Sequence, residues 1–416
     1  MKSDMKKYFL LFTLWLCTLA VMAQTDSLWI LSGRVVDAKT RKPMAYVSVT
    51  SQSVGTVTNE DGEFTLKLKQ EPSYVNFSCL GYQTRKCEAG SLKRLPNGRM
   101  ESDLQMKPSS VMLSEIVVQG RDAKDLVLMA IDKIADNYPR RPNLLRGFYR
   151  ETVQKRQRFV SISEGVVDVY KSGYQKSAYR DGVAILKGRR LLSMRSNDTL
   201  GVKLQGGPVL PVFLDVVKDR TILFNDEELG YYSFRYASPE KLGDRMQYVV
   251  EMRPQIFQAY ALFNGKLYID QETLAFTKID LSLDMSDPQK AAEMLLRSRP
   301  LGLRFAPREM TVSIDFKTDG GLTRLNYIRN VIRFRCDWKR KLFKSNFTIV
   351  SEMVTTDWQE GEDIKPIRLR DTFYRKDNFY DKVIYFDDPD FWGSDNIIEP
   401  TEDLLKGIEK IKRRLK

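Results

Sequence analysis

The feature that most constrains the fold is a series of short segments of alternating polarity between residues 32 and 82. In 64–68, the apolar residues Phe64, Leu66 and Leu68 fall on one side of an extended chain, which is the period of a half-buried strand. The turn before it, 59–62, ends in Asp-Gly, a pair that favours tight turns. Several short strands at this spacing predict a small antiparallel β-sandwich. The expected strands cover 33–36, 45–50, 55–58, 64–68 and 74–77.

The same stretch carries a set of motifs in a fixed order. They are Gly33-x-Val35, Thr40-x-x-Pro43, Val47-x-Val49, Gly55-Thr56-x-Thr58-Asn59-x-x-Gly62-x-Phe64-x-Leu66 and Phe77-Ser78-x-x-Gly81-Tyr82. Over residues 30–107 this set resembles the carboxypeptidase-like regulatory domain, a transthyretin-like β-sandwich. Segment 113–120 is similar to the exit segment that often follows this domain in outer-membrane proteins of Gram-negative, Bacteroidetes-type envelopes. The resemblance implies an accessory module without peptidase activity.

The N-terminus has the pattern of a secretory signal peptide over residues 1–23. Three lysines in the first seven residues precede the apolar run 8–21, which is too short to span a membrane. We predict cleavage after Ala23 and export to the periplasm or to the outer membrane as an associated protein. A lipoprotein signal at Cys17 is disfavoured, because large residues precede that cysteine where small ones are required.

The net charge of the chain is +13, and removal of a signal with three lysines and one aspartate leaves +11. A basic envelope protein can meet acidic glycans or lipid headgroups, and a basic surface can also be merely solvated. The export signal and the lack of an aromatic-basic motif argue against a nucleic-acid partner.

The chain contains no histidine. This excludes Ser-His and Cys-His nucleophile pairs and the usual ligands of zinc peptidases, so no zinc carboxypeptidase activity is expected. Cys79, Cys87 and Cys336 remain after cleavage, so at least one thiol is unpaired within the chain. Cys79 and Cys87 can pair only if the chain turns back near Gly81, and otherwise they are small buried residues.

Residues 108–143 are expected to contain the exit segment and a linker helix, which Asp122 can cap. A β-rich domain then covers 144–386, with a single clear helix at 288–297. Its hairpin from Gly265 to Asp280 looks like those of periplasmic lipoprotein-carrier proteins, which fold as a curved antiparallel sheet over helices. The predicted fold class is therefore mainly β, a sandwich, a linker helix and a curved antiparallel sheet with few helices.

The loop 204–211 is rich in glycine and proline and reads either as a plain connector or as a lid over a cavity. The last part, 387–416, combines an acidic turn with an amphipathic helix. The stripe of that helix can dock on the β-rich domain, or the basic segment 401–416 can associate peripherally with an anionic membrane. No transmembrane segment is expected in the mature chain.

The acidic turn contains the one candidate metal site. Asp388, Asp390 and Glu399 stand at positions 1, 3 and 12 of a calcium loop, with Gly393 at position 6. Trp392 occupies a place where an oxygen ligand belongs, so a structural turn is the competing interpretation. No catalytic residue, cofactor or ligand-binding residue is predicted elsewhere.

Two hypotheses of function follow. The first is a non-enzymatic exported envelope protein in which the sandwich is an accessory or adaptor module. The β-rich domain would then bind an envelope protein, a lipid or a glycan. An apolar cavity in that domain would favour a lipid carrier, and a filled core would remove this version. The alternative is a glycan hydrolase that works with paired carboxylates, such as Asp388 and Asp390, and without histidine.

Overall fold

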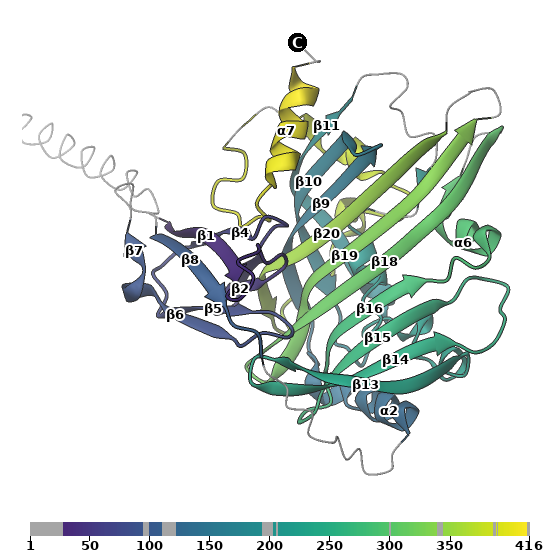
Figure 1. Ribbon diagram of the computed structural model, residues 1–416, viewed down its shortest axis with the longest axis horizontal. Helices are drawn as coiled ribbons and strands as arrows, with labels where there is room; N and C mark the ends of the chain where they lie inside the picture. The colour runs from purple at the N-terminus through teal and green to yellow at the C-terminus, as the bar shows by residue number, and fades with distance from the viewer. Residues whose placement is uncertain are drawn as a thin grey trace, which may run out of the picture.

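The computed structural model describes residues 28–94, 100–109, 122–193, 203–204, 207–298, 301–338, 344–385, 388 and 390–413, and it is mainly β (Figure 1). The predicted signal peptide 1–23 and the exit segment 113–120 lie outside these residues. The described strands form a sandwich of two four-stranded sheets, one eleven-stranded sheet and one two-stranded ribbon. The predicted fold class is confirmed.

The first described residues form the predicted sandwich. Sheet A has the order β4-β1-β8-β7 and sheet B the order β3-β2-β5-β6. Phe64 and Phe77 meet edge to face in its core, with ring centroids 5.3 Å apart. One pairing differs from the expected antiparallel pattern, because β8 adds to β1 in parallel after the chain has passed through sheet B. The strands are β1 (Trp29–Asp37), β2 (Ser48–Ser51), β3 (Val54–Val57), β4 (Glu63–Leu68), β5 (Tyr74–Ser78), β6 (Arg85–Glu88), β7 (Lys93–Arg94) and β8 (Met100–Met106).

The large sheet is curved and has the strand order β13-β14-β15-β16-β18-β19-β20-β9-β10-β11-β21 (Figure 1). Its long strands pair antiparallel, and only the short β21 pairs in parallel, with β11. The last long strand, β20, lies beside the first, β9, so the chain closes the sheet across a long sequence separation.

The strands of the large sheet are β9 (Asn143–Lys155), β10 (Arg158–Lys171), β11 (Gly182–Leu192), β13 (Tyr232–Leu242), β14 (Arg245–Pro254), β15 (Phe263–Asp270), β16 (Phe276–Leu283), β18 (Leu303–Asp319), β19 (Leu322–Trp338), β20 (Ser345–Glu360) and β21 (Ile384–Tyr385). The ribbon pairs β12 (Lys203–Leu204) with β17 (Leu296–Ser298).

The helices are few and short. They are α2 (Ala123–Asp132), α3 (Ile134–Asn137), α4 (Leu210–Phe213), α5 (Asp226–Leu229), α6 (Pro288–Leu295) and α7 (Glu402–Lys412), with 3-10 turns at Ala89–Ser91, Ala178–Arg180, Arg220–Ile222, Leu369–Asp371 and Phe379–Lys382. The side chain of Asp122 accepts a hydrogen bond from the Lys124 main chain and caps α2 as predicted. None of the described helices is both long enough and apolar enough to cross a bilayer.

One face of the large sheet, the inner face, is filled by the chain itself. In β16 the residues Ile279 and Leu281 point to this face, and they join a core that includes α2, α6 and the segment 207–229. Phe224 of that segment stacks on Phe276 at 4.9 Å between ring centroids. Residues 207–209 of the breaker-rich loop are buried and continue directly into this segment, as a plain connector would.

An ion pair in the interior anchors that segment to the sheet. Lys171 of β10 lies 2.5 Å from Asp215, and both side chains are fully buried. Tyr174 donates a second hydrogen bond to Asp215 at 2.8 Å. Lys218 donates to the hydroxyl of Ser172 at 2.9 Å and to main-chain carbonyls nearby. Buried charges of this kind are tolerated when their hydrogen bonds are satisfied.

The opposite, outer face carries the sandwich and the C-terminal segments. Phe148 and Val354 of the sheet pack with Val57 of the sandwich and with Trp392. Helix α7 docks on β10 and β11 through Leu404 and its other apolar residues, so the predicted docking is confirmed for the described part of the helix. Membrane association through 401–416 stays a prediction.

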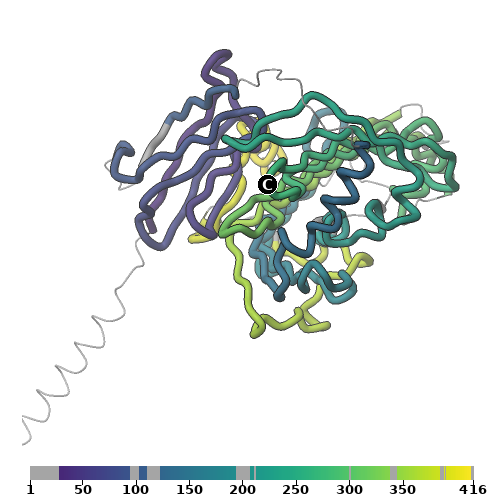
Figure 2. The backbone as a smooth tube through the Cα atoms, turned by 90° about the horizontal axis from the view of Figure 1, so that it is seen from below, coloured from purple at the N-terminus to yellow at the C-terminus, as the bar shows by residue number. Residues whose placement is uncertain are grey.

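The segment 390–400, called the C-terminal strap here, passes between the sandwich and the large sheet (Figure 2). The side-chain amide of Asn396 accepts from the Lys67 amide at 2.7 Å and donates to the Lys67 carbonyl at 2.9 Å. This pairing satisfies the main-chain N–H and C=O groups of Lys67 at the edge of β4, as a neighbouring strand would. On the other side, Arg150 of β9 donates to the carbonyl of Ile398 at 2.7 Å.

Candidate functional site

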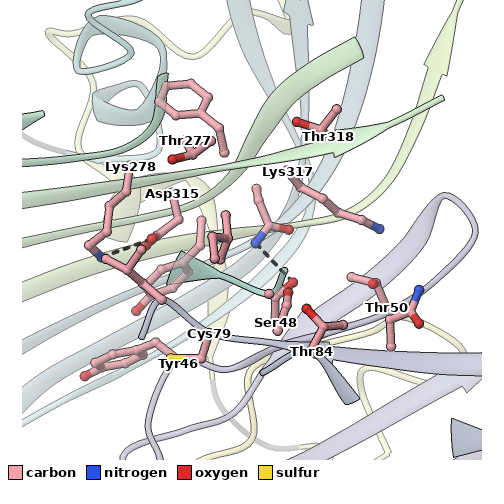
Figure 3. Close-up of a pocket in the computed structure, with 18 of the residues that line it drawn as sticks. Tyr46, Ser48, Thr50, Cys79, Thr84, Thr277, Lys278, Asp315, Lys317 and Thr318 are labelled. Atoms are coloured by element: carbon pink, nitrogen blue, oxygen red, sulfur yellow. Dashed lines mark hydrogen bonds and ion pairs between the residues drawn. The ribbon is translucent and has the colours of Figure 1, made fainter. Parts of the chain in front are cut away.

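A cavity of about 590 Å³ lies between sheet B of the sandwich and the outer face of the large sheet, and we call it the interdomain pocket (Figure 3). One wall comes from β2, β5 and residues 79–84. The other comes from β16, β18 and β19, and the turn between β13 and β14 closes one end. This volume falls within the range of pockets that bind small molecules.

The floor of the pocket holds a lysine between acidic groups. The Lys278 ammonium lies 3.0 Å from Asp315 on the neighbouring strand and 3.5 Å from Asp280, and it donates to Ser313 at 2.9 Å. Burial alone would lower the pKa of Lys278, but the two carboxylates outweigh it and hold that pKa above its ordinary value. Burial raises the pKa of Asp315, and Lys278 opposes this rise. The side chains of Lys278 and Asp315 remain 21% and 29% exposed.

Three further cations line the pocket, and they are Lys317, Arg245 and Arg329. Lys317 donates to the carbonyl of Gln52 in the sandwich at 3.3 Å. Burial lowers the pKa of Lys317, and the charge of Asp319 opposes this shift. Arg245, beside the β13–β14 turn, lies 3.1 Å from the fully buried carboxylate of Asp270. An incoming ligand therefore meets positive charge on more than one side.

An aromatic pair forms another part of the wall. Tyr46 of the sandwich stacks on Tyr327 of β19 with ring centroids 5.4 Å apart, and the guanidinium of Arg329 lies 5.2 Å from the Tyr46 ring. Arg329 also pairs with Glu60 at 2.9 Å. Tyr46 has a φ of 60°, a left-handed conformation that costs a non-glycine residue roughly 1–2 kcal/mol. Strained residues of this kind persist where the surrounding contacts fix them, and they gather at binding sites.

The sandwich wall is rich in hydroxyl and amide groups. Asn326 of β19 donates across the domain boundary to the Ser48 hydroxyl at 3.3 Å. Figure 3 shows Ser48, Thr50 and Thr84 on the sandwich side, facing Lys278, Asp315 and Lys317 on the other. Groups of these types donate and accept hydrogen bonds, so they suit a polar ligand.

Direct contacts between the domains hold the two walls in place. The Gly81 amide donates to the Lys241 carbonyl at 2.7 Å, which joins the sandwich to the end of β13. Gly243 in the adjoining turn has a φ of 63°, and a Cβ there would lie 2.4 Å from the Thr84 hydroxyl. Only glycine fits both this backbone conformation and the short distance to Thr84.

The lining also contains a thiol. Cys79, Cys87 and Cys336 are free thiols. Burial raises the pKa of Cys79, which faces the pocket, to about 11, so it is a protonated thiol near neutral pH. The two carboxylates of the floor are held by the same lysine. The described lining therefore offers hydrogen bonds, charges and aromatic surface to a ligand.

The structure places the predicted calcium-loop residues in and beside the strap. Asp388 and Asp390 lie close together at the surface, where the Asp390 amide donates to the Asp388 carboxylate at 2.8 Å. Glu399 lies further along, and its carbonyl accepts a hydrogen bond from Arg150 at 3.5 Å. Trp392 is buried and packs edge to face on Phe148 at 5.2 Å.

Cationic side chains bind the carbonyls of this turn. Lys187 donates to the carbonyls of Phe391 and Trp392, and Lys67 donates to that of Gly393. Within the described part of the chain, no three acidic, cysteine or histidine side chains are grouped closely enough to hold a metal ion. The calcium site stays a prediction.

The pocket residues were not predicted from the sequence, although a signal for them exists. Lys278, Asp280 and Ser282 alternate with apolar residues along β16, which marks a polar outer face. The alternation cannot reveal that a second domain covers part of that face.

The structure thus combines a β-sandwich with a large curved sheet and places a polar pocket between them. Residues 31–118 match the family model of the CarboxypepD_reg-like domain, so the N-terminal sandwich is a domain of this kind and the predicted resemblance is confirmed. The comparison with curated proteins gives no match.

Three solved structures resemble the chain at 10% identity. A structure described as an outer membrane lipoprotein-sorting protein domain, from Vibrio parahaemolyticus, covers 58% of this chain and 94% of its own, with a TM-score of 0.27. A DUF1329 family protein from Desulfovibrio piger covers 58% and 93%, with a TM-score of 0.23. A membrane-associated protein of unknown function from Bacteroides fragilis covers 80% and 98%, with a TM-score of 0.16. Likenesses at these scores carry no argument about function.

Proposed function

We propose that this protein is an exported, non-enzymatic envelope protein that binds a polar ligand in the interdomain pocket. The sandwich is the accessory module that supplies one wall, and the large sheet supplies the other. The observation that carries the proposal is the pocket itself. It combines hydroxyl and amide groups, an aromatic pair and the Lys278–Asp315 pair, and residues from both domains line it.

The inner face supports a lipid carrier less well. A carrier needs an open apolar concavity, whereas the described inner face is packed with its own side chains. A small cavity there, between Tyr149, Leu214 and Met353, measures about 10 Å³, which is too small for an acyl chain. The proposed ligand is therefore polar, and its site is on the outer face.

Calorimetric titration of the mature chain with disaccharides, amino-sugar disaccharides and tri- to pentapeptides tests this function. The Asp315→Asn variant keeps the shape of the pocket but removes the charge beside Lys278. The matched control is Asp337→Asn, the same change near the end of β19. We expect one ligand class to bind wild type and the control equally and Asp315→Asn about tenfold more weakly, a loss of about 1.4 kcal/mol. No binding from the panel, or equal binding by all three proteins, would overturn the proposal.

The glycan-hydrolase alternative finds less support in the geometry. Asp388 and Asp390 are exposed, before and at the start of the strap. Lys278 bridges the pocket carboxylate Asp315 and its neighbour Asp280, so these two acids do not face each other across a free gap. Turnover of envelope glycans that disappears in an Asp388→Asn, Asp390→Asn double variant would restore this alternative.

A further inference from the structure

A single row of charged residues crosses the outer face of the large sheet. Residues directly opposite each other on paired strands share a face, so the strand register identifies the row. Its signs alternate along the sheet, with one serine near the middle. The row is Arg235, Glu251, Lys266, Asp280, Ser313, Arg329, Glu352, Arg150, Glu164 and Arg189.

One half of this row is covered and already binds polypeptide. Arg150 and Glu164 are buried, and Arg150 donates to the carbonyl of Ile398 in the strap. Arg189 donates to the carbonyl of Asp388 at 3.2 Å, and Arg329 binds the carboxylate of Glu60 at 2.9 Å. In each case an arginine of the row holds a main-chain carbonyl or an acidic side chain of a segment that lies over the sheet.

The other half of the row is open to solvent. It forms a groove of about 480 Å³ whose lining includes Glu251, Arg253 and Lys266. The side chain of Lys266 is 48% exposed and that of Arg253 is 67% exposed. The groove and the interdomain pocket share Ser313 and Arg329, so the two cavities adjoin along β18 and β19.

We infer that the ligand of the interdomain pocket is an extended segment of another polypeptide, which donates hydrogen bonds to Asp315 in the pocket and places acidic side chains along the open groove. The covered half of the row shows the mode of contact, since its arginines bind carbonyl and carboxylate oxygens. A polypeptide supplies a carbonyl at every residue. Its acidic side chains match Arg253 and Lys266 of the groove, where they compete with Glu251, which lies 3.1 Å from Arg253 and 3.9 Å from Lys266. The inference rests on the proposed function, because the same ligand enters the pocket.

The test uses the mature chain and two probes of fixed chemistry. One is a fluorescent, unstructured decapeptide rich in Asp, Glu, Ser and Gly, and the other is the same peptide with Lys in place of the acids. Anisotropy titrations compare wild type with Lys266→Glu in the groove and with Lys410→Glu on the exposed side of α7, which makes the same charge change away from the groove.

We expect the acidic peptide to bind wild type and Lys410→Glu alike and to bind Lys266→Glu at least tenfold more weakly, with an affinity that falls as salt rises. The lysine peptide should bind wild type weakly. If a sugar or a short peptide binds the pocket and Lys266→Glu leaves all binding unchanged, the polypeptide inference fails and the proposed function stands. If neither the decapeptides nor the pocket panel binds, both fail.

Discussion

Replacement of Arg150 by methionine should lower the free energy of unfolding by about 3 kcal/mol, because it breaks a buried ion pair. The side chain of Arg150 is 5% exposed, and its Nε lies 2.7 Å from a carboxylate oxygen of Glu164, which is 1% exposed. The same guanidinium lies 3.5 Å from Glu352 and holds the strap at Ile398. Methionine keeps the apolar stem and removes the charge and the donors.

The magnitude follows from what the change leaves behind. Removal of one partner of a buried ion pair costs about 3–5 kcal/mol, since the other charge stays buried without compensation. Here both carboxylates keep a second donor. Arg189 lies 3.0 Å from Glu164, and the Tyr327 hydroxyl donates to Glu352 at 2.8 Å. We therefore expect the lower end of that range.

Urea unfolding followed by tryptophan fluorescence measures the loss, and Arg333→Met is the matched control. Arg333 pairs with Glu309 at 2.7 Å, but the two side chains are 56% and 34% exposed. Exposed pairs of this kind contribute about 0–1 kcal/mol. If the two variants lose the same stability within about 0.5 kcal/mol, burial of the Arg150 network is not what stabilises the docked strap, and the reasoning is refuted.

Three other changes test the docking and the core. Asn396→Ala removes both side-chain hydrogen bonds to the edge of β4. It should lower the free energy of unfolding by about 1–3 kcal/mol and speed amide exchange in β4. Unchanged amide exchange would contradict this. Burial lowers the pKa of Lys218 to about 8, so the unfolded state, whose lysine titrates near 10.4, binds more protons between those pH values. Wild-type stability should therefore rise from pH 8 to 10, by at most about 1.4 kcal/mol per pH unit, and urea titrations of Lys218→Met should lack this contribution. Gly243→Ala should lower the melting temperature more than Gly320→Ala does. Both glycines have a positive φ, but only a Cβ at position 243 would meet another residue, Thr84. Equal melting temperatures would show that this contact is not tight.

Much of the local structure could be predicted from the sequence. The alternation of Phe64, Leu66 and Leu68 gave strand β4, and Asp122 marked the start of α2. The polar turn after Asp270 gave the hairpin of β15 and β16. These features depend on residues that are neighbours in the chain, where side-chain period and turn chemistry decide the backbone conformation.

The pocket could not be predicted, because it depends on contacts between distant parts of the chain. Ser48 and Asn326 meet across it, and the strand register alone brings Lys278 beside Asp315. Periodicity shows which side chains share a face but does not reveal which face another domain covers. The same limit explains the strap, where the sequence indicated an acidic turn and the structure shows a clamp on the edge of β4 through Asn396.

Binding in the interdomain pocket should be coupled to docking of the sandwich, because the pocket exists only while both walls are in place. A ligand that contacts Thr84 and Lys278 together binds the docked state and not a state in which the domains have separated. By mass action it stabilises the docked state by about 2.7 kcal/mol at one hundred times its dissociation constant. Ligand and strap therefore act on the same equilibrium, and Asn396→Ala should weaken ligand binding although that side chain is not among the residues that line the pocket. If the variant binds ligand as tightly as wild type while exchange at β4 is accelerated, docking and binding are independent, and the sandwich wall contributes no affinity.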